Sequence, residues 1–257
     1  MASGLTPDVR VHRDADSLAA ATATALLETI GAAAAGGAGC SLALAGGTTP
    51  GALYRRLGSA PPSPIGWGKV EIFWGDERYV PPEDPRSNYR MAKEAWLDRA
   101  AIPPESIHPM PTHFGDPNEA ASAYEATMRG SFAGTCPRFN IILLGLGADG
   151  HTASLFPGSP ALAERSRWVV AAKAPADPPV RLTLTLPVLN NAERVWFLVS
   201  GKEKAPALAR VLAMGKPEEF GPPAAAVRPA NGTVVWWVDQ AAAALLNLPG
   251  RTPGPDG

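Results

Sequence analysis

Residues 145–151 read GLGADGH and place a carboxylate, Asp149, two positions before an imidazole, His151. They directly follow the apolar run FNIILL. A histidine can accept a proton near neutral pH, and a neighbouring carboxylate can fix its tautomer and raise its basicity. The pair therefore predicts a general base at the end of a strand. A capping role for His151 and local backbone hydrogen bonds to Asp149 would explain the same two residues.

The same loop matches G-x-G-x-x-G, the pattern of a dinucleotide-binding turn. That turn needs a helix of useful length after its third glycine and an acidic residue about 20 positions further on. Here Pro157 and Gly158 limit any helix after Gly150 to roughly two turns, and the next strand-like run ends at Lys173. The sequence therefore disfavours dinucleotide binding.

A second polar turn, AGGTTP, supplies Gly46, Gly47, Thr48 and Thr49 after another strand-like run. Thr49 resembles the nucleophile of a G-x-S-x-G elbow, but the following residue is Pro50, which has no N–H for an oxyanion hole. The turn also lacks the Gly-Lys-Ser/Thr ending of a P-loop. Backbone N–H groups at a helix start, together with two hydroxyls, suit a phosphate. An ordinary strand-to-helix turn capped by Thr49 explains the residues equally well.

Two charged turns complete the candidate chemistry. The stretch WGDERYV contains Asp76, Glu77 and Arg78, and SGKEK contains Lys202 and Lys204. Arginine binds phosphate through its planar fork, and either lysine is long enough to reach one. The alternative is that the first turn forms surface ion pairs and that both lysines are solvated.

Strand-like runs alternate with helical patterns along the chain, which predicts an α/β fold with a mostly parallel sheet. Several runs are continuously apolar, as in a sheet covered on both faces. We expect strands at 9–12, 41–44, 70–74, 139–144, 168–172, 181–186, 195–199 and 234–238. We expect helices at 16–34, with Asp16 as N-cap, and at 50–57, 88–97, 118–129 and 204–214.

All four polar turns follow strand-like runs. Sheets of this class bind ligands at the carboxyl ends of their strands. The sequence therefore predicts that the four turns share one site.

Composition restricts the class of protein. The chain has 257 residues and a net charge of −1, which fits one α/β domain over 1–257, with a frayed tail after about 248, and gives no reason to expect nucleic acid binding. No secretory h-region and no uninterrupted apolar stretch of about 18 residues is present, so we expect a cytoplasmic protein outside the membrane. We interpret Cys40 and Cys136 as reduced structural thiols, and neither lies in a metal-binding motif.

Four blocks, in order and over nearly the whole chain, resemble the 6-phosphogluconolactonase family: LALAGGTTP, WGDERYVPPEDPRSNYRMAKEAWL, FNIILLGLGADGHTASLFPGS and RLTLTLPVLNNAERVWFLVSGKEKA. The third block is highly specific. The resemblance implies a modified doubly wound α/β sheet with helices on both faces, shared with glucosamine-6-phosphate deaminase. It implies hydrolysis of 6-phospho-D-glucono-1,5-lactone to 6-phosphogluconate in the oxidative pentose phosphate pathway. The expected partner is this small lactone, with no cofactor and no metal, in a monomer or weak oligomer.

The resemblance also carries over residue roles, motif by motif. His151 matches the base that activates water, and Asp149 matches its partner. Arg78 and Lys204 match phosphate ligands, with the turn Gly46–Thr49 beside them. Arg181, in RLTLT, matches a further substrate-binding position whose role is less defined.

Two other functions stay open on the same residues. A glucosamine-6-phosphate deaminase would use acids such as Asp76 to move a proton, but the Asn-Glu that we expect before the proline of that enzyme's block is missing. A sugar-phosphate sensor without activity would keep its phosphate ligands. It would have no need of the pair formed by Asp149 and His151.

Overall fold

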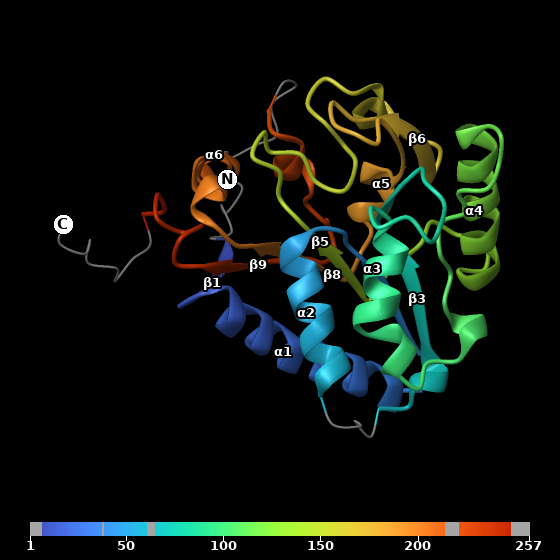
Figure 1. The fold of residues 1–257 in the computed structure, drawn as a ribbon, viewed down its shortest axis with the longest axis horizontal. Helices are drawn as coiled ribbons and strands as arrows, with labels where there is room; N and C mark the ends of the chain where they lie inside the picture. The colour runs from blue at the N-terminus through green and yellow to red at the C-terminus, as the bar shows by residue number, and fades with distance from the viewer. Residues whose placement is uncertain (1–6, 38, 61–64, 214–220, 248–257) are drawn as a thin grey trace.

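The structure is a computed structural model that describes residues 7–37, 39–60, 65–213 and 221–247. Its centre is a sheet of six strands in the order β1-β9-β8-β5-β2-β3, and every neighbouring pair is parallel. The mostly parallel α/β architecture is therefore confirmed (Figure 1). The strands are β1 (Asp8–His12), β2 (Cys40–Leu44), β3 (Val70–Trp74), β5 (Ile141–Leu144), β8 (Arg194–Val199) and β9 (Thr233–Asp239).

A second, antiparallel sheet of three strands was not expected. It has the order β4-β7-β6, with β4 at Asp76–Arg78, β7 at Val180–Leu184 and β6 at Val169–Lys173. Gly75 joins the two sheets, because its N–H donates to Leu44 O at 2.8 Å and its carbonyl accepts from Leu184 N at 2.8 Å. The charged turn after β3 is thus itself a strand.

Helices flank the central sheet. Figure 1 shows α2 and α3 in front of the central strands and α4 along the right edge. The helices are α1 (Ala15–Ala35), α2 (Thr48–Ser59), α3 (Asn88–Ala95), α4 (Pro117–Ser131), α5 (Leu186–Leu189) and α6 (Ala205–Ala213). Short 3₁₀ segments lie at η1 (Trp67–Lys69), η2 (Leu97–Arg99), η3 (Pro104–Ser106), η4 (Pro160–Ala163), η5 (Lys202–Lys204) and η6 (Pro223–Ala226).

Two helix caps and one strand end differ from the sequence interpretation. Asp14, not Asp16, caps α1, because its carboxylate accepts from Ser17 N at 2.8 Å in a capping box. Gly47 and not Thr49 is the N-cap of α2. The strand expected over 181–186 ends at Leu184, since a proline in the first turn starts α5 immediately afterwards. The expected end of the last helix, Met214, lies outside the described residues.

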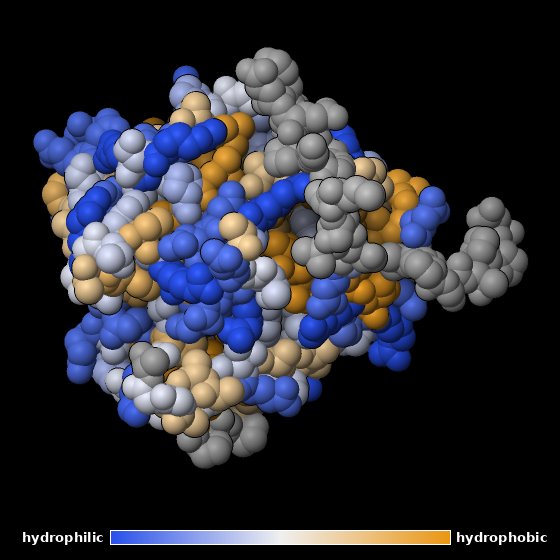
Figure 2. Space-filling model, turned by 180° about the vertical axis from the view of Figure 1, so that it is seen from behind, coloured by the Kyte–Doolittle hydropathy of each residue, from blue (hydrophilic) through white to orange (hydrophobic). Residues whose placement is uncertain are grey.

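The core explains the apolar composition of α1. Among the described residues, only α1 is long and apolar enough to cross a membrane. Its side chains Leu18, Leu26 and Ile30 are completely buried in the core that the helix forms with the sheet. The surface is mixed: Figure 2 shows mostly hydrophilic residues with scattered apolar ones.

The two cysteines have different environments. Cys40 is buried at the start of β2, and burial raises the pKa of its thiol to about 11. Cys136 is exposed. Both are free thiols.

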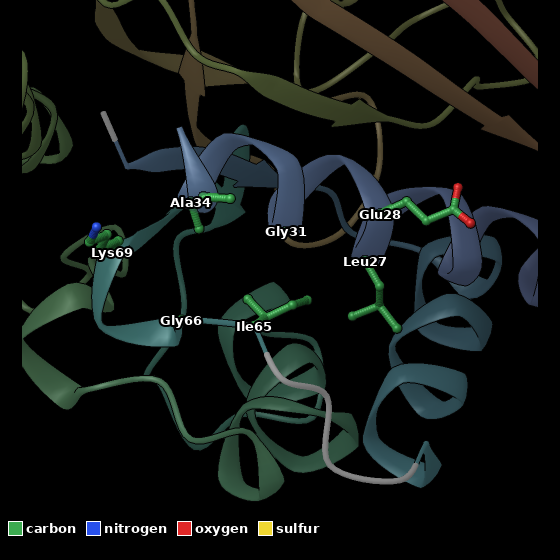
Figure 3. A pocket seen from close by; sticks show the side chains of 8 residues that line it. Leu27, Glu28, Gly31, Ala34, Ile65, Gly66 and Lys69 are labelled. Carbon is green, nitrogen blue, oxygen red and sulfur yellow. The ribbon is translucent and has the colours of Figure 1, made fainter. Parts of the chain in front are cut away.

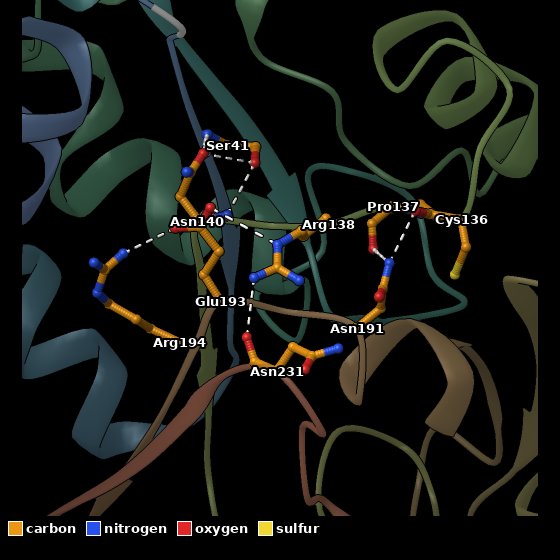
Figure 4. A network of polar contacts seen from close by, with 9 residues as sticks. All are labelled: Ser41, Cys136, Pro137, Arg138, Asn140, Asn191, Glu193, Arg194 and Asn231. Atoms are coloured by element: carbon orange, nitrogen blue, oxygen red, sulfur yellow. Dashed lines mark hydrogen bonds and ion pairs between the residues drawn. The ribbon is translucent and has the colours of Figure 1, made fainter. Parts of the chain in front are cut away.

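A polar network closes the amino-terminal edge of the central sheet (Figure 4). Asn140 Oδ1 accepts from the N–H of Ser41 at 2.8 Å, which ties the start of β2 to the chain before β5. Arg138 donates to the carbonyl of Asn231 at 2.9 Å, just before β9. These contacts are local to that edge, and the polar turns lie at the opposite edge.

Candidate active site

The four polar turns meet in one cavity of ≈ 400 Å³ at the carboxyl edge of the central sheet. Strand register brings them together, because Leu44 lies opposite Trp74, and Leu144 opposite Phe197 near the end of β8. Of the nine residues singled out from the sequence, all except Asp149 line this cavity: Gly46, Gly47, Thr48, Thr49, Arg78, His151, Arg181 and Lys204.

His151 and Asp149 form a hydrogen-bonded pair at the cavity wall. His151 Nδ1 lies 2.6 Å from Asp149 Oδ1, and the backbone N–H of His151 donates to the same oxygen at 3.0 Å. Because an ionised carboxylate only accepts, we assign the ring proton to Nδ1, which leaves Nε2 as the basic nitrogen. The alternative in which His151 caps a helix is wrong, since residues 152–155 form a turn closed by a bridge between Thr152 and Leu155.

The hydrogen bonds keep Asp149 ionised. Partial burial opposes its charge, but the backbone and ring N–H groups of His151 outweigh burial and lower the pKa of the Asp149 carboxyl. The carboxylate therefore stays charged at a pH where an ordinary aspartate is partly protonated. A charged partner orients the imidazole and stabilises it after it has taken up a proton.

The loop that carries the pair depends on close backbone packing. A Cβ at Gly147 would lie 2.0 Å from His151 Nδ1 and 2.6 Å from Asp149 Oδ1. Gly150 has φ +89, in the left-handed region, and a Cβ there would lie 2.4 Å from Pro222 Cβ. Arg210, on α6, donates to the Asp149 carbonyl at 2.9 Å. The loop that carries His151 and Asp149 thus itself requires these glycines, and dinucleotide binding is not needed to explain them.

Two arginines oppose each other across the small sheet. Arg78 in β4 pairs in register with Arg181 in β7, and both line the cavity. Like charges directly opposite on a sheet are destabilising. Burial first, and the neighbouring Arg78 second, lower the pKa of Arg181. An anion bound between the two guanidinium groups would relieve this repulsion.

The backbone orients each arginine. Arg78 Nη1 donates to the carbonyl of Arg86 at 2.5 Å, and Arg181 Nε donates to the carbonyl of Pro178 at 2.8 Å. Among the described residues, the other N–H groups of the two guanidinium forks have no hydrogen-bond partner.

Further anion-binding groups line the same cavity. The N-cap of α2 is Gly47, whose φ of 100 turns the chain into the helix, and no side chain caps the first turn of that helix. The first-turn N–H groups of a helix attract anions. Lys204 also lines the cavity, whereas Lys202 is exposed and does not. By residue type alone, either lysine could reach a phosphate, and the structure places only Lys204 of the two at the cavity.

Asp76 and Glu77, for which surface ion pairs were the alternative interpretation, are both buried. Asp76 lines the cavity and accepts from Ser154 Oγ at 2.7 Å, and Asn88 Nδ2 donates to the Asp76 carbonyl at 2.9 Å. Glu77 accepts at 2.7 Å from the backbone N–H groups of Arg78, Asn88 and Tyr89, and it also accepts from Ser87 Oγ at 3.0 Å. Burial raises the pKa of Glu77, and these donors oppose that shift. The surface ion-pair interpretation is therefore wrong for both acids.

Sequence reasoning missed Asn88 and Ser154 as cavity residues. Asn88 is the first residue of α3 and is 1% exposed, so its side chain faces inward. Neither residue type stands out in its motif. The return of the chain through β4 and α3 brings Asn88 to the cavity, and Ser154 reaches it in the turn that follows His151.

A second, more open cavity of ≈ 580 Å³ lies between α1 and the segment 65–69 (Figure 3). Its walls are mainly apolar, and Glu28 and Lys69 are its charged residues. Among its described lining residues, no base is paired with an orienting acid. Among the described residues, no cluster of three or more His, Cys, Asp or Glu side chains is placed to hold a metal.

Known proteins resemble this chain in sequence and in fold. The sequence profile of the family described as glucosamine-6-phosphate isomerases/6-phosphogluconolactonase matches residues 13–236. A protein of Synechocystis sp. named 6-phosphogluconolactonase is 45% identical over 206 residues, which cover 79% of this chain and 82% of the relative. A Mycobacterium tuberculosis protein of the same name is 41% identical over 249 residues, covering 94% and 99%.

The fold also resembles that of a solved structure. The 6-phosphogluconolactonase from Trypanosoma cruzi superposes with a TM-score of 0.83 at 31% identity, and the match covers 94% of this chain and 97% of that one. The chain belongs to the family of glucosamine-6-phosphate isomerases and 6-phosphogluconolactonases.

Proposed function

We propose that this chain hydrolyses 6-phospho-D-glucono-1,5-lactone to 6-phosphogluconate. The observation that carries the proposal is one cavity that combines the His151–Asp149 pair with two opposed arginines. A base suits attack by water on an ester, and the cationic side suits a phosphate. The names of the relatives support the same reaction.

In the proposed mechanism, water attacks the lactone carbonyl directly. Nε2 of His151 removes a proton from the water as its oxygen bonds to the carbonyl carbon. The bond between that carbon and the ring oxygen then breaks, and the imidazolium returns the proton to the ring oxygen as a hydroxyl forms. Asp149 stabilises the imidazolium between these steps. A positioned base of this kind contributes about 10²–10⁴-fold to the rate.

The phosphate would supply binding energy away from the reacting carbon. Arg78, Arg181, Lys204 and the Gly46–Thr49 turn would hold it, and the fixed phosphate would orient the ring over His151. We also propose that backbone N–H groups of the glycine turns stabilise the oxyanion. The reaction needs no redox step, and the proposal involves neither a cofactor nor a metal.

The wider setting follows from the same proposal. We place the activity in the cytoplasm and in the oxidative pentose phosphate pathway. We assign it to a single domain over residues 1–257, active as a monomer or weak oligomer.

A lactone assay tests the proposed function. After correction for spontaneous opening, we expect the wild type to hydrolyse the phosphorylated lactone and to prefer it over glucono-1,5-lactone without phosphate. Release of ammonia from glucosamine 6-phosphate without lactone hydrolysis would instead make the chain a deaminase. Binding of 6-phosphogluconate with neither activity would make it a sensor.

Arg78→Ala should act mainly on substrate binding. Loss of a charged hydrogen bond of about 1.5–3 kcal/mol should raise KM for the phosphorylated lactone roughly 10–100-fold, with kcat less affected. The preference over the unphosphorylated lactone should fall by the same factor, measured as the ratio of the two kcat/KM values. Arg13→Ala is the control, because Arg13 is exposed and is not among the residues that line the cavity. An unchanged preference in Arg78→Ala would exclude Arg78 as a phosphate ligand.

A further inference from the structure

A buried carboxylate outside the predicted set holds one of the four polar turns. Asp239, the last residue of β9, is 5% exposed. It accepts from Ser200 Oγ at 2.5 Å and from the backbone N–H of Gly201 at 3.1 Å through Oδ2, and from the N–H of Ala242 at 2.7 Å through Oδ1. All three donors are neutral, so these bonds fix backbone and hydroxyl geometry and do not form an ion pair.

The turn held by Asp239 leads directly to the cavity lysine. Gly201 follows Ser200 with φ +106, a conformation that favours glycine. Its carbonyl accepts from the N–H of Lys204 at 3.1 Å, which closes η5 before α6 begins. Ser200 and Lys204 both line the cavity. A chain of hydrogen bonds therefore runs from the end of β9 to the backbone of Lys204.

We propose that Asp239 is a positioning residue that holds Lys204 toward the phosphate of the substrate; this inference rests on the proposed function. A lysine side chain is long and has several rotamers, so its reach is set by where its backbone is fixed. Strand β9 is paired in parallel with β8, so Asp239 at the end of β9 lies beside the turn after β8. Its carboxylate accepts the hydrogen bonds of Ser200 and Gly201 in that turn. Because hydrogen bonds to charged groups are among the stronger ones, loss of the charge should loosen the turn.

Asp239→Asn preserves the size of the side chain and removes its charge. We expect the dissociation constant for 6-phosphogluconate to rise roughly 5–30-fold, less than the roughly 10–100-fold for outright loss of a charged hydrogen bond, because the Lys204 side chain is kept. KM for the phosphorylated lactone should rise in parallel. The value of kcat should stay close to wild type, and so should kcat/KM for the unphosphorylated lactone, because His151 and Asp149 belong to another loop.

A double-mutant cycle separates positioning from general stability. If Asp239 acts through Lys204, then Asp239→Asn should have little further effect on 6-phosphogluconate binding in a Lys204→Ala background. Full additivity of the two substitutions would overturn the inference. Asn140→Ala, which breaks a backbone hydrogen bond at the opposite edge of the sheet, controls for ordinary destabilisation and should bind 6-phosphogluconate like the wild type. If Asn140→Ala weakened 6-phosphogluconate binding as much as Asp239→Asn does, the inference would also be overturned.

Two further measurements keep the test decisive. Should Asp239→Asn fail to fold, Ser200→Ala replaces it, because it removes the hydrogen bond from Ser200 Oγ to Asp239. Its effect on 6-phosphogluconate binding should be smaller, and that effect should also disappear in the Lys204→Ala background. Binding is measured by calorimetry and needs no turnover. A wild type that binds 6-phosphogluconate but hydrolyses no lactone would therefore refute the proposed function, while the cycle still decides the role of Asp239. An additive cycle in an active enzyme would refute the inference alone.

Discussion

His151→Ala is expected to lower kcat for the phosphorylated lactone by about 10²–10⁴-fold, the range that a positioned general base contributes. The reason is that Nδ1 of His151 is engaged by Asp149, so that Nε2 is the basic atom of this pair at the cavity. Binding should change little, since the cationic groups lie on other elements. Stopped assays of lactone opening and calorimetry with 6-phosphogluconate measure the two effects separately.

The control for this prediction is His113→Ala. His113 is exposed and absent from the cavity lining, so its loss should leave both turnover and binding as they are in the wild type. Turnover near the wild-type rate in His151→Ala would exclude a base role for that residue. Weakened 6-phosphogluconate binding with normal kcat would instead make His151 a binding residue.

The sequence was most informative where one element decides the position of a residue. Mostly apolar runs such as Val70–Trp74, in which only Glu71 is polar, predicted strands with correct bounds, because a strand buried on both faces has little room for polar residues. Since all central strands are parallel, predicting the strands also predicted that their polar ends meet. The cavity residues on the four polar turns, Gly46–Thr49, Arg78, His151 and Lys204, follow from that step, whereas Arg181 was matched only through the family resemblance.

The sequence was least informative where contacts between distant segments determine whether a side chain is buried and which groups it bonds to. Asp76 and Glu77 have the composition of a surface cluster, yet β4 pairs with β7 some 100 residues later and α3 folds over them. Their burial depends on backbone N–H groups that compensate the carboxylates, and no local pattern encodes those donors. Asp239 is similar, since its partners at 200 and 201 lie on the neighbouring strand's turn.

Helix ends are intermediate in how well the sequence predicts them. Asp14 and Asp16 are both acceptable N-caps by residue type, and Ser17 decides between them because only Asp14 can form the reciprocal pair three residues before it. A capping-box pattern in the sequence contains that information. At Gly47 the decisive quantity is a φ of 100, which favours glycine over threonine at the cap.

Gly147→Ala should reduce turnover almost as far as His151→Ala does. An added methyl group would lie 2.0 Å from His151 Nδ1 and 2.3 Å from Cε1 of the same ring, so the imidazole must leave its present position. Its hydrogen bond to Asp149 at 2.6 Å would be broken or distorted. Displacements of about 1 Å at reacting groups can cost on the order of 10²-fold. We therefore expect kcat to fall at least about 10²-fold, with 6-phosphogluconate binding largely kept.

Gly68→Ala is the matched control, because a Cβ at Gly68 meets nothing within 4 Å. Both variants add one methyl group to a glycine, and denaturant unfolding shows whether either loses stability. A fall in kcat confined to Gly147→Ala, in a protein that unfolds at nearly the wild-type denaturant concentration, would tie the loss to the displaced imidazole. Normal turnover in Gly147→Ala would mean that the orientation of His151 by Asp149 is not needed for the reaction. Because His151→Ala removes the base and Gly147→Ala only moves it, comparing the two variants separates the presence of the imidazole from its placement.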